Sequence, residues 1–330
     1  MDIIRDDAID PAPLAGKRVA IIGYGNQGRA QALNLADSGI DLVIGLREGS
    51  DTFDKVRADG LTPVNIEDAP KGAALTMMLV PDEQMTGIYG VIEPALEHGS
   101  ALGFSHGLAE HFGYIDPRED LDVILVAPKG PGTALRQLYT EGKGMPALWA
   151  VSTDKSGKAK QIALAYGKAI GCARAGLIAS SFEEECVADL FNEQAVVWGG
   201  VPALLLAGYE TLVEAGYSEE VAYFECITEL KLLADLIEAR GIAGMREAIS
   251  NTAELGAVLG GPAIVDFPVR KRMREILKSV QQGEFAAQLA EEAAEGYPLL
   301  KKMRAEAGDH ASEVTLAKLA RLSPNKPSSD

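Results

Sequence analysis

The stretch Arg18-Val19-Ala20-Ile21-Ile22-Gly23-Tyr24-Gly25-Asn26-Gln27-Gly28 decides the fold, because it joins a short apolar run to a glycine-rich turn. Residues 18–22 predict a buried strand, and residues 26–37 predict the helix that follows the turn. A G-x-G-x-x-G string between a strand and a helix is typical of dinucleotide-binding βαβ units. The sequence therefore predicts a Rossmann-type α/β domain at the amino-terminal end.

Each glycine of this turn has a separate physical role. Gly23 permits the tight turn, Gly25 lets the backbone approach a pyrophosphate, and Gly28 allows the helix to pack closely on the strand. The alternative is a glycine-rich turn that holds no ligand. The predicted cofactor-binding residues of the turn are Gly23, Tyr24, Gly25, Asn26, Gln27 and Gly28.

The choice of dinucleotide depends on the end of the second strand, at Gly45-Leu46-Arg47. Arg47 suits the 2′-phosphate of NADPH, and Ser50 and Thr52 could add hydroxyl donors. Asp51 would repel that phosphate but would accept hydrogen bonds from the bare ribose of NADH. Alternatively, Asp51 points to solvent or caps the following helix. We expect the protein to use both cofactors, with NADH at least competitive.

Short apolar runs alternate with amphipathic stretches up to about residue 176, which is typical of a parallel α/β sheet. Further strands are expected at 42–44, 74–80, 100–104, 123–126 and 147–151, and helices at 83–96, 132–139 and 155–170. After Ser180 the strand pattern ends, and helices are expected at 182–215, 218–239, 241–254, 262–282 and 284–305. We therefore predict a Rossmann domain over 1–180 and an all-α domain over 181–330.

The composition excludes several classes of partner. The chain has 330 residues, 47% of them hydrophobic, and a net charge of -17, which disfavours binding to nucleic acid or to anionic membranes. The acidic start of the sequence and the lack of a run of about 18 apolar residues lead us to expect no signal peptide and no membrane span. The cysteines 172, 186 and 226 show no paired spacing, so we expect reduced thiols and a cytoplasmic location. Residues 323–330 are expected to fray.

Two pairs of acids in the helical part indicate a metal site. Asp189 and Glu193 are four residues apart, as are Glu225 and Glu229, and both pairs stand among apolar residues. Buried carboxylates need a compensating cation, and all-oxygen ligands suit Mg²⁺. Alternatively, the acids pair with basic residues such as Lys231. Acids at 183–185 and 291–295 are interpreted as solvated faces.

Three further polar residues are candidates for substrate chemistry. His106 and Lys129 follow predicted strands, so their loops should face the same crevice as the glycine-rich turn. A structural or solvated role is the alternative for both. Ser250, in the stretch 250–254 that is expected to close a helix, could bind a substrate carboxylate, although capping is the simpler interpretation.

Taken together, six motifs give the chain a family resemblance over about residues 16–304. They are Gly-Tyr-Gly-Asn-Gln-Gly (23–28), Ser-His-Gly (105–107), Pro-Lys-Gly-Pro-Gly (128–132), Asp-Leu-Phe-x-Glu-Gln (189–194), Tyr-Phe-Glu-x-x-x-Glu-Leu-Lys-Leu (223–232) and Ser-Asn-Thr-Ala-Glu (250–254). In this order they closely resemble ketol-acid reductoisomerase, also called acetohydroxyacid isomeroreductase, in its short class I form.

The resemblance implies a two-step reaction at one site. A Mg²⁺-dependent alkyl shift in 2-acetolactate or 2-aceto-2-hydroxybutyrate is followed by reduction with NAD(P)H to a 2,3-dihydroxy acid, in valine and isoleucine biosynthesis. Asp189, Glu193, Glu225 and Glu229 resemble the ligands of two Mg²⁺ ions, with the second pair coming from a partner subunit for one of the sites. The resemblance also implies a knotted helical domain and a homodimer that assembles further in some forms.

The same resemblance assigns the remaining polar residues. Ser250 resembles the substrate-carboxylate contact, His106 and Lys129 the supporting polar network, and Glu229 a residue that also handles protons. Asn192 and Thr228 depart from a common Gly and a frequent His, but neither change removes a ligand. The alternative functions are a metal-independent dehydrogenase of the β-hydroxyacid or 6-phosphogluconate type and a non-catalytic nucleotide sensor.

Overall fold

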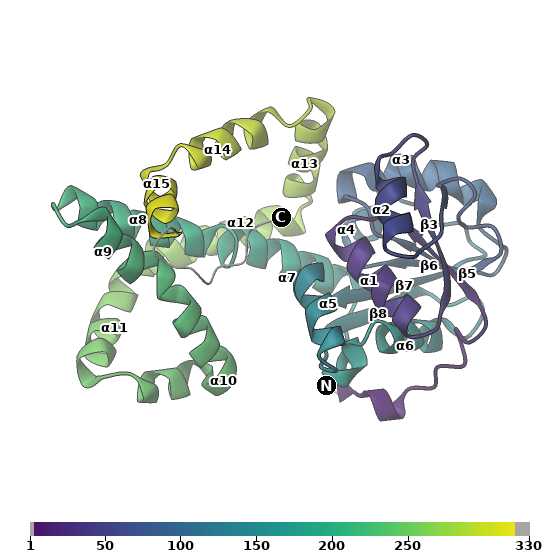
Figure 1. The fold of residues 1–330 in the computed structure, drawn as a ribbon, viewed down its shortest axis with the longest axis horizontal. Helices are drawn as coiled ribbons and strands as arrows, with labels where there is room; N and C mark the ends of the chain where they lie inside the picture. The colour runs from purple at the N-terminus through teal and green to yellow at the C-terminus, as the bar shows by residue number, and fades with distance from the viewer. Residues whose placement is uncertain (1–2, 321–330) are drawn as a thin grey trace. The chain divides into compact units, whose positions relative to one another are not determined.

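The computed structural model describes residues 3–320, and the chain forms two compact units that meet between Ala188 and Asp189. The division lies inside helix α7 (Phe182–Ala195), a little after the boundary expected at residue 180. The fraying predicted for 323–330 lies outside the described residues. Figure 1 shows the sheet of the first unit and the helices of the second.

Within residues 3–320, the first unit is built on one nine-stranded sheet with the order β1-β9-β8-β7-β6-β5-β2-β3-β4. The strands are β1 (Ile3–Ile4), β2 (Arg18–Ile22), β3 (Asp41–Leu46), β4 (Pro63–Asn65), β5 (Ala73–Met78), β6 (Ala101–Phe104), β7 (Asp122–Pro128), β8 (Ala147–Thr153) and β9 (Leu177–Ala179). The six strands from β4 to β7 along the sheet are parallel. Their order reverses between β2 and β5, which is the Rossmann arrangement. The predicted Rossmann-type α/β domain is confirmed.

The prediction of a wholly parallel sheet is wrong at its far edge. Strand β8 runs antiparallel to β7, with Val126 opposite Trp149, and β1 runs antiparallel to β9. An apolar run shows that a strand is buried but carries no information about its direction. The short strands β1, β4 and β9 were not predicted, because two or three residues are too few to show a period.

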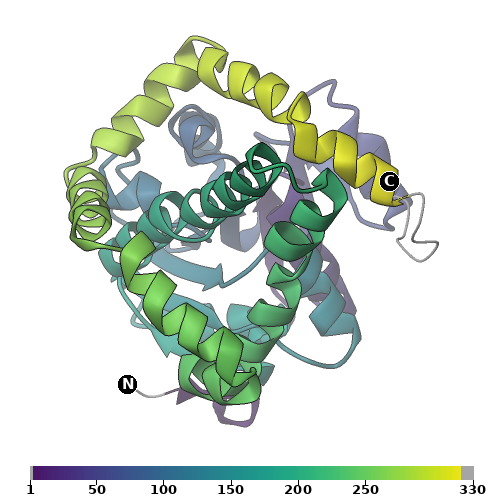
Figure 2. The ribbon, with the colours of Figure 1, turned by 90° about the vertical axis from the view of Figure 1, so that its left-hand side faces the viewer.

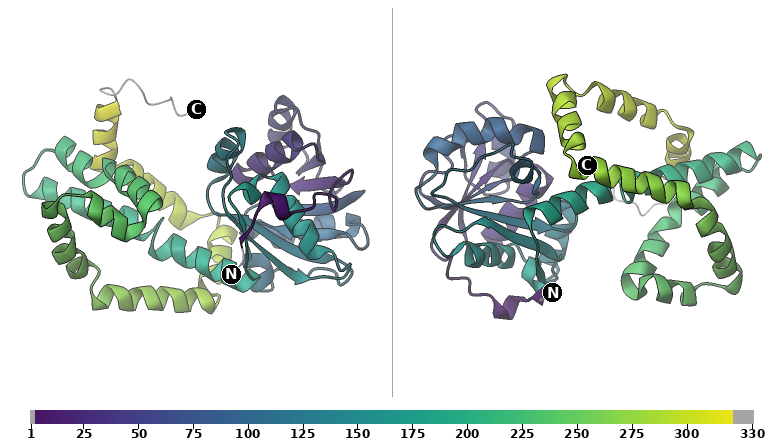
Figure 3. Two further views of the ribbon diagram at one scale, coloured as in Figure 1. Left: turned by 90° about the horizontal axis from the view of Figure 1, so that it is seen from below. Right: turned by 180° about the vertical axis from the view of Figure 1, so that it is seen from behind.

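Helices cover both faces of this sheet, as a parallel sheet requires. In β2, Val19 and Ile21 join the core on one face, whereas Ala20 and Ile22 join the core on the other, and all four are fully buried. The first face is covered by α1 (Asn26–Asp37), α5 (Gly132–Thr140) and α6 (Ala159–Ala169), and the second by α3 (Asp82–Ile92) and α4 (Leu108–His111). Figure 3 shows these layers from two sides.

In the residues that the structure describes, the second unit is entirely helical, as predicted. Glycines with positive φ interrupt the expected long helices, for example Gly296 within the predicted 284–305 segment. The helices after α7 are α8 (Gly200–Glu214), α9 (Glu219–Tyr223), a π-helical segment (Phe224–Thr228), α10 (Leu230–Ala248), α11 (Asn251–Ile264), α12 (Phe267–Gln281), α13 (Glu284–Ala294), α14 (Pro298–Gly308) and α15 (Ala311–Ala320).

The apolar helix faces of the second unit are not buried within one chain, contrary to our expectation. Trp198 is 63% exposed, Leu259 68% and Phe267 72%. In Figure 2 the helices from α10 to α14 follow one another in an open arrangement. One stretch of residues 3–320, Phe182–Glu214, is long and apolar enough to cross a membrane by length and composition, which is weak evidence for a membrane span.

Candidate functional site

The glycine-rich turn has the geometry expected of a dinucleotide-binding loop. Gly23 has a φ of +97°, and its N–H donates to the Gly45 carbonyl over 3.1 Å. A Cβ on Gly28 would lie 2.5 Å from the Gly23 carbonyl oxygen, so only glycine fits there. A Cβ on Gly25 would meet no atom within 4 Å. The turn is thus closed where the helix packs and open at the residue where phosphates would approach.

A pocket of about 300 Å³ adjoins this turn at the carboxyl ends of β2, β3 and β5. This is the point where the strand order reverses, which is where dinucleotides bind in such sheets. Its lining includes Gly23, Tyr24, Gly25, Arg47, Ser50 and Thr52 of the predicted cofactor residues. The open turn, the basic residue and the two hydroxyls fit the phosphates and ribose of a dinucleotide.

Asp51 does not line this pocket. It stands at the start of α2 (Thr52–Ala58), is exposed, and its side chain makes no capping hydrogen bond. The capping interpretation is therefore wrong, since the Thr52 N–H donates instead to Ser50 Oγ over 3.3 Å. Asp51 is exposed and lies between Ser50 and Thr52, which do line the pocket.

Tyr24 is held in the pocket wall by two residues that sequence reasoning missed. Its hydroxyl donates to Asp59 Oδ2 over 2.8 Å, and Arg29 binds both oxygens of the same carboxylate at 2.7 and 2.8 Å. Hydrogen bonding from Arg29 lowers the pKa of Asp59, and burial raises the pKa of the Tyr24 phenol. Tyr24 thus stays neutral and fixed. Its partner lies 35 residues away, at a distance that no local pattern reveals.

Asn26 and Gln27 connect the turn to the loop that carries Lys129. Gln27 Nε2 donates to the Gly130 carbonyl over 2.9 Å, and Asn26 Oδ1 accepts from the Thr133 N–H over 3.3 Å. A Cβ on Gly132 would lie 2.2 Å from the Asn26 carbonyl oxygen, so the two segments touch directly. In this structure these two side chains hold the neighbouring loop in place.

Lys129 lies against a buried glutamate that we misjudged from the sequence. Glu185 is 1% exposed, although residues 183–185 were expected to form a solvated face. Its Oε1 accepts from Lys129 Nζ over 2.7 Å, and its Oε2 accepts from the Gly107 N–H over 2.8 Å. A buried carboxylate with two donors is satisfied and well ordered. Glu185 therefore positions Lys129 and the loop of His106 together.

His106 follows β6, as predicted, and its ring is largely buried. Its Nδ1 lies 2.8 Å from Oδ2 of Asp82, the first residue of α3. The side chains of His106 and Asp82 are 17% and 21% exposed. The structure therefore brings together the two predicted loops of the first unit and adds Glu185 and Asp82 to them.

The four predicted metal ligands are not gathered into one site within residues 3–320. Asp189 is half-buried, whereas Glu193, Glu225 and Glu229 are exposed, and no group of three His, Cys, Asp or Glu side chains in this range could hold a metal. Lys231 forms its ion pair with Asp235 over 2.7 Å, which removes it as the expected partner of these acids. Exposed carboxylates fit a Mg²⁺ site whose remaining ligands come from outside this set.

The acids of the second pair lie on a widened helical turn. Glu225 is inside the π-helical segment, and the N–H of Glu229 donates to the carbonyl of Phe224, five residues earlier. Such turns are rare and are frequent at functional sites. The two acids are therefore not related by the regular α-helical period that we assumed.

Ser250 opens a helix, whereas the sequence suggested that its segment closes one. It is the N-cap residue of α11, and its hydroxyl accepts from the Ala253 N–H over 3.2 Å. The capping interpretation is thus confirmed. The side chain is also exposed, so the cap leaves the hydroxyl proton available to a ligand.

Comparison with known proteins identifies the family. Residues 13–176 match the family described as acetohydroxy acid isomeroreductase, NADPH-binding domain, and residues 182–325 match ketol-acid reductoisomerase, C-terminal domain. The chain is 48% identical over 322 residues to a ketol-acid reductoisomerase (NADP(+)) from Kineococcus radiotolerans, covering 97% of this chain and 94% of that protein.

Solved structures agree with this result. An NADH-preferring ketol-acid reductoisomerase from an uncultured archean superposes with a TM-score of 0.95 at 44% identity, covering 98% of this chain and all of that one. A semialdehyde dehydrogenase NAD-binding protein from Cupriavidus necator reaches a TM-score of 0.59 at 19% identity, over 81% of this chain and 99% of that one, and shares the fold alone. With two domains matched in order, the chain belongs to the ketol-acid reductoisomerase family of nicotinamide-dependent oxidoreductases.

Proposed function

We propose that the protein converts 2-acetolactate or 2-aceto-2-hydroxybutyrate into the corresponding 2,3-dihydroxy acid in valine and isoleucine biosynthesis. An alkyl group moves to the neighbouring carbon, and the resulting 2-keto acid is reduced while NAD(P)H is oxidised. The observation that carries this proposal is the connection between the cofactor pocket and the polar loops. Gln27 ties the glycine-rich turn to the Lys129 loop, and Glu185 ties Lys129 to the His106 loop.

In this proposal the polar residues of the first unit handle charge on the substrate. The Lys129 ammonium stabilises negative charge on substrate oxygens, and Glu185 keeps that ammonium in one position. His106 exchanges protons through its imidazole. The open backbone at Gly25 and the hydroxyls of Ser50 and Thr52 orient the dinucleotide, which supplies the hydride when bound.

We also propose that Asp189 and Glu193 of one subunit, with Glu225 and Glu229 of another, hold two Mg²⁺ ions. Their carboxylates are the hard oxygen ligands that Mg²⁺ prefers, and three of the four are exposed within one chain, where a partner subunit could reach them. The ions would polarise the carbonyl and stabilise the alkoxide that alkyl migration requires. Glu229 would accept or return a proton near them, and Ser250 would bind the substrate carboxylate.

A homodimer with a knotted helical domain is part of the same proposal, as is assembly of dimers into larger forms. Its support is the set of large apolar side chains left exposed in the second unit, including Leu255, Leu259, Ile264 and Phe267. Exposed apolar faces of this extent are typical of an obligate interface. We place the enzyme in the cytoplasm, where the cysteine thiols would stay reduced.

For the cofactor, we propose use of both NADH and NADPH with NADH at least competitive. Arg47 lines the pocket and favours a 2′-phosphate, whereas the carboxylate of Asp51 stands beside Ser50 and Thr52 and disfavours it. The two relatives named above differ in the same respect, since one is named for NADP(+) and the other as NADH-preferring.

The decisive assay measures oxidation of NADH and NADPH with 2-acetolactate, with Mg²⁺ and after its removal by EDTA and dialysis. We expect turnover only with Mg²⁺. Turnover that persists without the metal would favour the dehydrogenase alternative, and cofactor binding without any turnover would favour the sensor. A tenfold or greater preference for NADPH in kcat/KM would refute our interpretation of Asp51.

A further inference from the structure

The contact between Asp82 and His106 joins the cofactor pocket to the polar loops of the site. Asp82 directly follows Pro81, and Leu79, Val80 and Pro81 all line the pocket. On its other side, Asp82 Oδ2 lies 2.8 Å from Nδ1 of His106. One loop therefore contributes a wall to the pocket and a carboxylate to the histidine.

The chemistry of this pair fixes one form of the ring. A carboxylate can only accept a hydrogen bond, so Nδ1 must carry the proton and Nε2 is left with a lone pair in the neutral ring. The other oxygen of Asp82, Oδ1, is buried and has no hydrogen-bond partner among the described residues. Within this part of the chain, His106 is thus the side chain that holds the carboxylate in place. The amino end of α3 adds a favourable field for the negative charge.

We propose that Asp82 is a positioning residue that holds His106 in the Nδ1–H form, with Nε2 as the nitrogen that exchanges protons. Because Asp82 directly follows Leu79, Val80 and Pro81, the orientation of the His106 ring also depends on this wall of the cofactor pocket. The inference rests on the proposed role of His106 in turnover, but the state of the ring can be measured without turnover.

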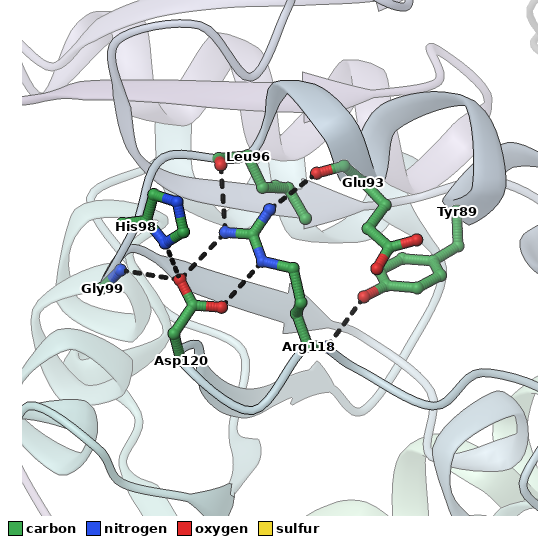
Figure 4. A network of polar contacts seen from close by, with 7 residues as sticks. All are labelled: Tyr89, Glu93, Leu96, His98, Gly99, Arg118 and Asp120. Carbon is green, nitrogen blue, oxygen red and sulfur yellow. Dashed lines mark hydrogen bonds and ion pairs between the residues drawn. The ribbon is translucent and has the colours of Figure 1, made fainter.

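A second histidine of the same unit provides a matched control. His98 Nδ1 lies 2.7 Å from Asp120 Oδ2, almost the same contact, but the His98 side chain is 92% exposed. Figure 4 shows this pair with Arg118, and none of its members lines the cofactor pocket. Asp120→Asn therefore removes an equivalent contact where no role in the reaction is expected.

The experiment records ¹⁵N chemical shifts of the imidazole nitrogens in the full-length protein, which has four histidines. The spectrum of His106→Gln identifies the signals of His106 by their loss. In Asp82→Asn the amide can donate to Nδ1, so we expect His106 to change to the Nε2–H form. Asp82→Ala should give a mixture of both forms, and Asp120→Asn should leave the His106 signals unchanged.

The kinetic result should follow the tautomer. We expect Asp82→Asn to lower kcat with 2-acetolactate by at least about tenfold, while the dissociation constants of NADH and NADPH change by less than about threefold. Unchanged His106 signals in both Asp82 variants would overturn the proposal, as would a loss of cofactor binding without a tautomer change. If wild-type protein shows no turnover, the proposed function fails, but the NMR result still decides the role of Asp82.

Discussion

Replacing Glu185 with glutamine tests whether the buried pair with Lys129 stabilises the first unit. Glutamine has nearly the same shape, so its amide oxygen can still accept from the Gly107 N–H. Its NH₂ group would then face the Lys129 ammonium, and a charge-assisted hydrogen bond of 2.7 Å is replaced by two opposed donors. The variant therefore removes one defined interaction and leaves the packing intact.

The expected cost follows from the exposure of the two partners. Breaking a buried ion pair costs about 3–5 kcal/mol, and a hydrogen bond to a charged group contributes about 1.5–3 kcal/mol. Glu185 is 1% exposed, but the Lys129 side chain is 32% exposed and can regain water. We therefore expect a loss near the lower range, about 2–3 kcal/mol. For a unit of this size, that corresponds to a decrease in Tm of about 5–10 °C.

The assay is thermal unfolding followed by circular dichroism, with Glu141→Gln as the control. Glu141 also binds a lysine, Lys143, at 2.9 Å, but both side chains are exposed, so its loss should give no measurable shift. A decrease in Tm below about 2 °C for Glu185→Gln would refute the reasoning. It would show that the pair behaves like an exposed ion pair despite the burial of its carboxylate.

Gly28→Ala should lower the free energy of unfolding by about 1–3 kcal/mol, because its Cβ would lie 2.5 Å from a carbonyl oxygen. Gly25→Ala should fold normally, because its Cβ meets no atom within 4 Å, but it should weaken NADH binding at least about tenfold in a fluorescence titration. Asp189→Asn should abolish turnover and keep cofactor binding, and near-normal activity would contradict its role as a metal ligand. In the folded protein, hydrogen bonding from Arg118 lowers the pKa of the Asp120 carboxyl group. The ionised Asp120 therefore contributes its full stability above about pH 4, and this contribution is lost as the pH falls further. The difference in Tm between wild type and Asp120→Asn should accordingly be constant from about pH 7 to 5 and shrink below about pH 4, and a difference that grows on acidification would show the sign to be wrong.

The glycine-rich turn could be predicted from sequence because its requirements are local. Gly23 needs a positive φ and Gly28 needs space, and both follow from a strand and a helix that adjoin them in the chain. Strand β2 and helix α1 were predicted with the bounds that the structure shows for the same reason. Likewise, the loops of His106 and Lys129 were placed correctly because parallel strands end at one edge.

Residues whose role depends on distant partners could not be predicted. Glu185 has the same local setting as a solvated acid, and its burial depends on Lys129, which lies 56 residues earlier. Asp82 and Asp59 act across 24 and 35 residues, so no short window includes both partners. The helices around Glu225 were expected to be buried because they are apolar. An apolar helix face does not reveal whether it packs against its own chain or against another molecule.

The unequal burial of the two units has a consequence for biogenesis. The amino-terminal unit covers both faces of its own sheet, so a chain emerging from the ribosome can complete it alone. The helical unit emerges later and leaves Leu259, Phe267 and similar side chains exposed in the single chain. In the proposed homodimer, newly made single chains would be the form most open to proteases and chaperones, and the rate at which chains meet would set the cellular yield of enzyme.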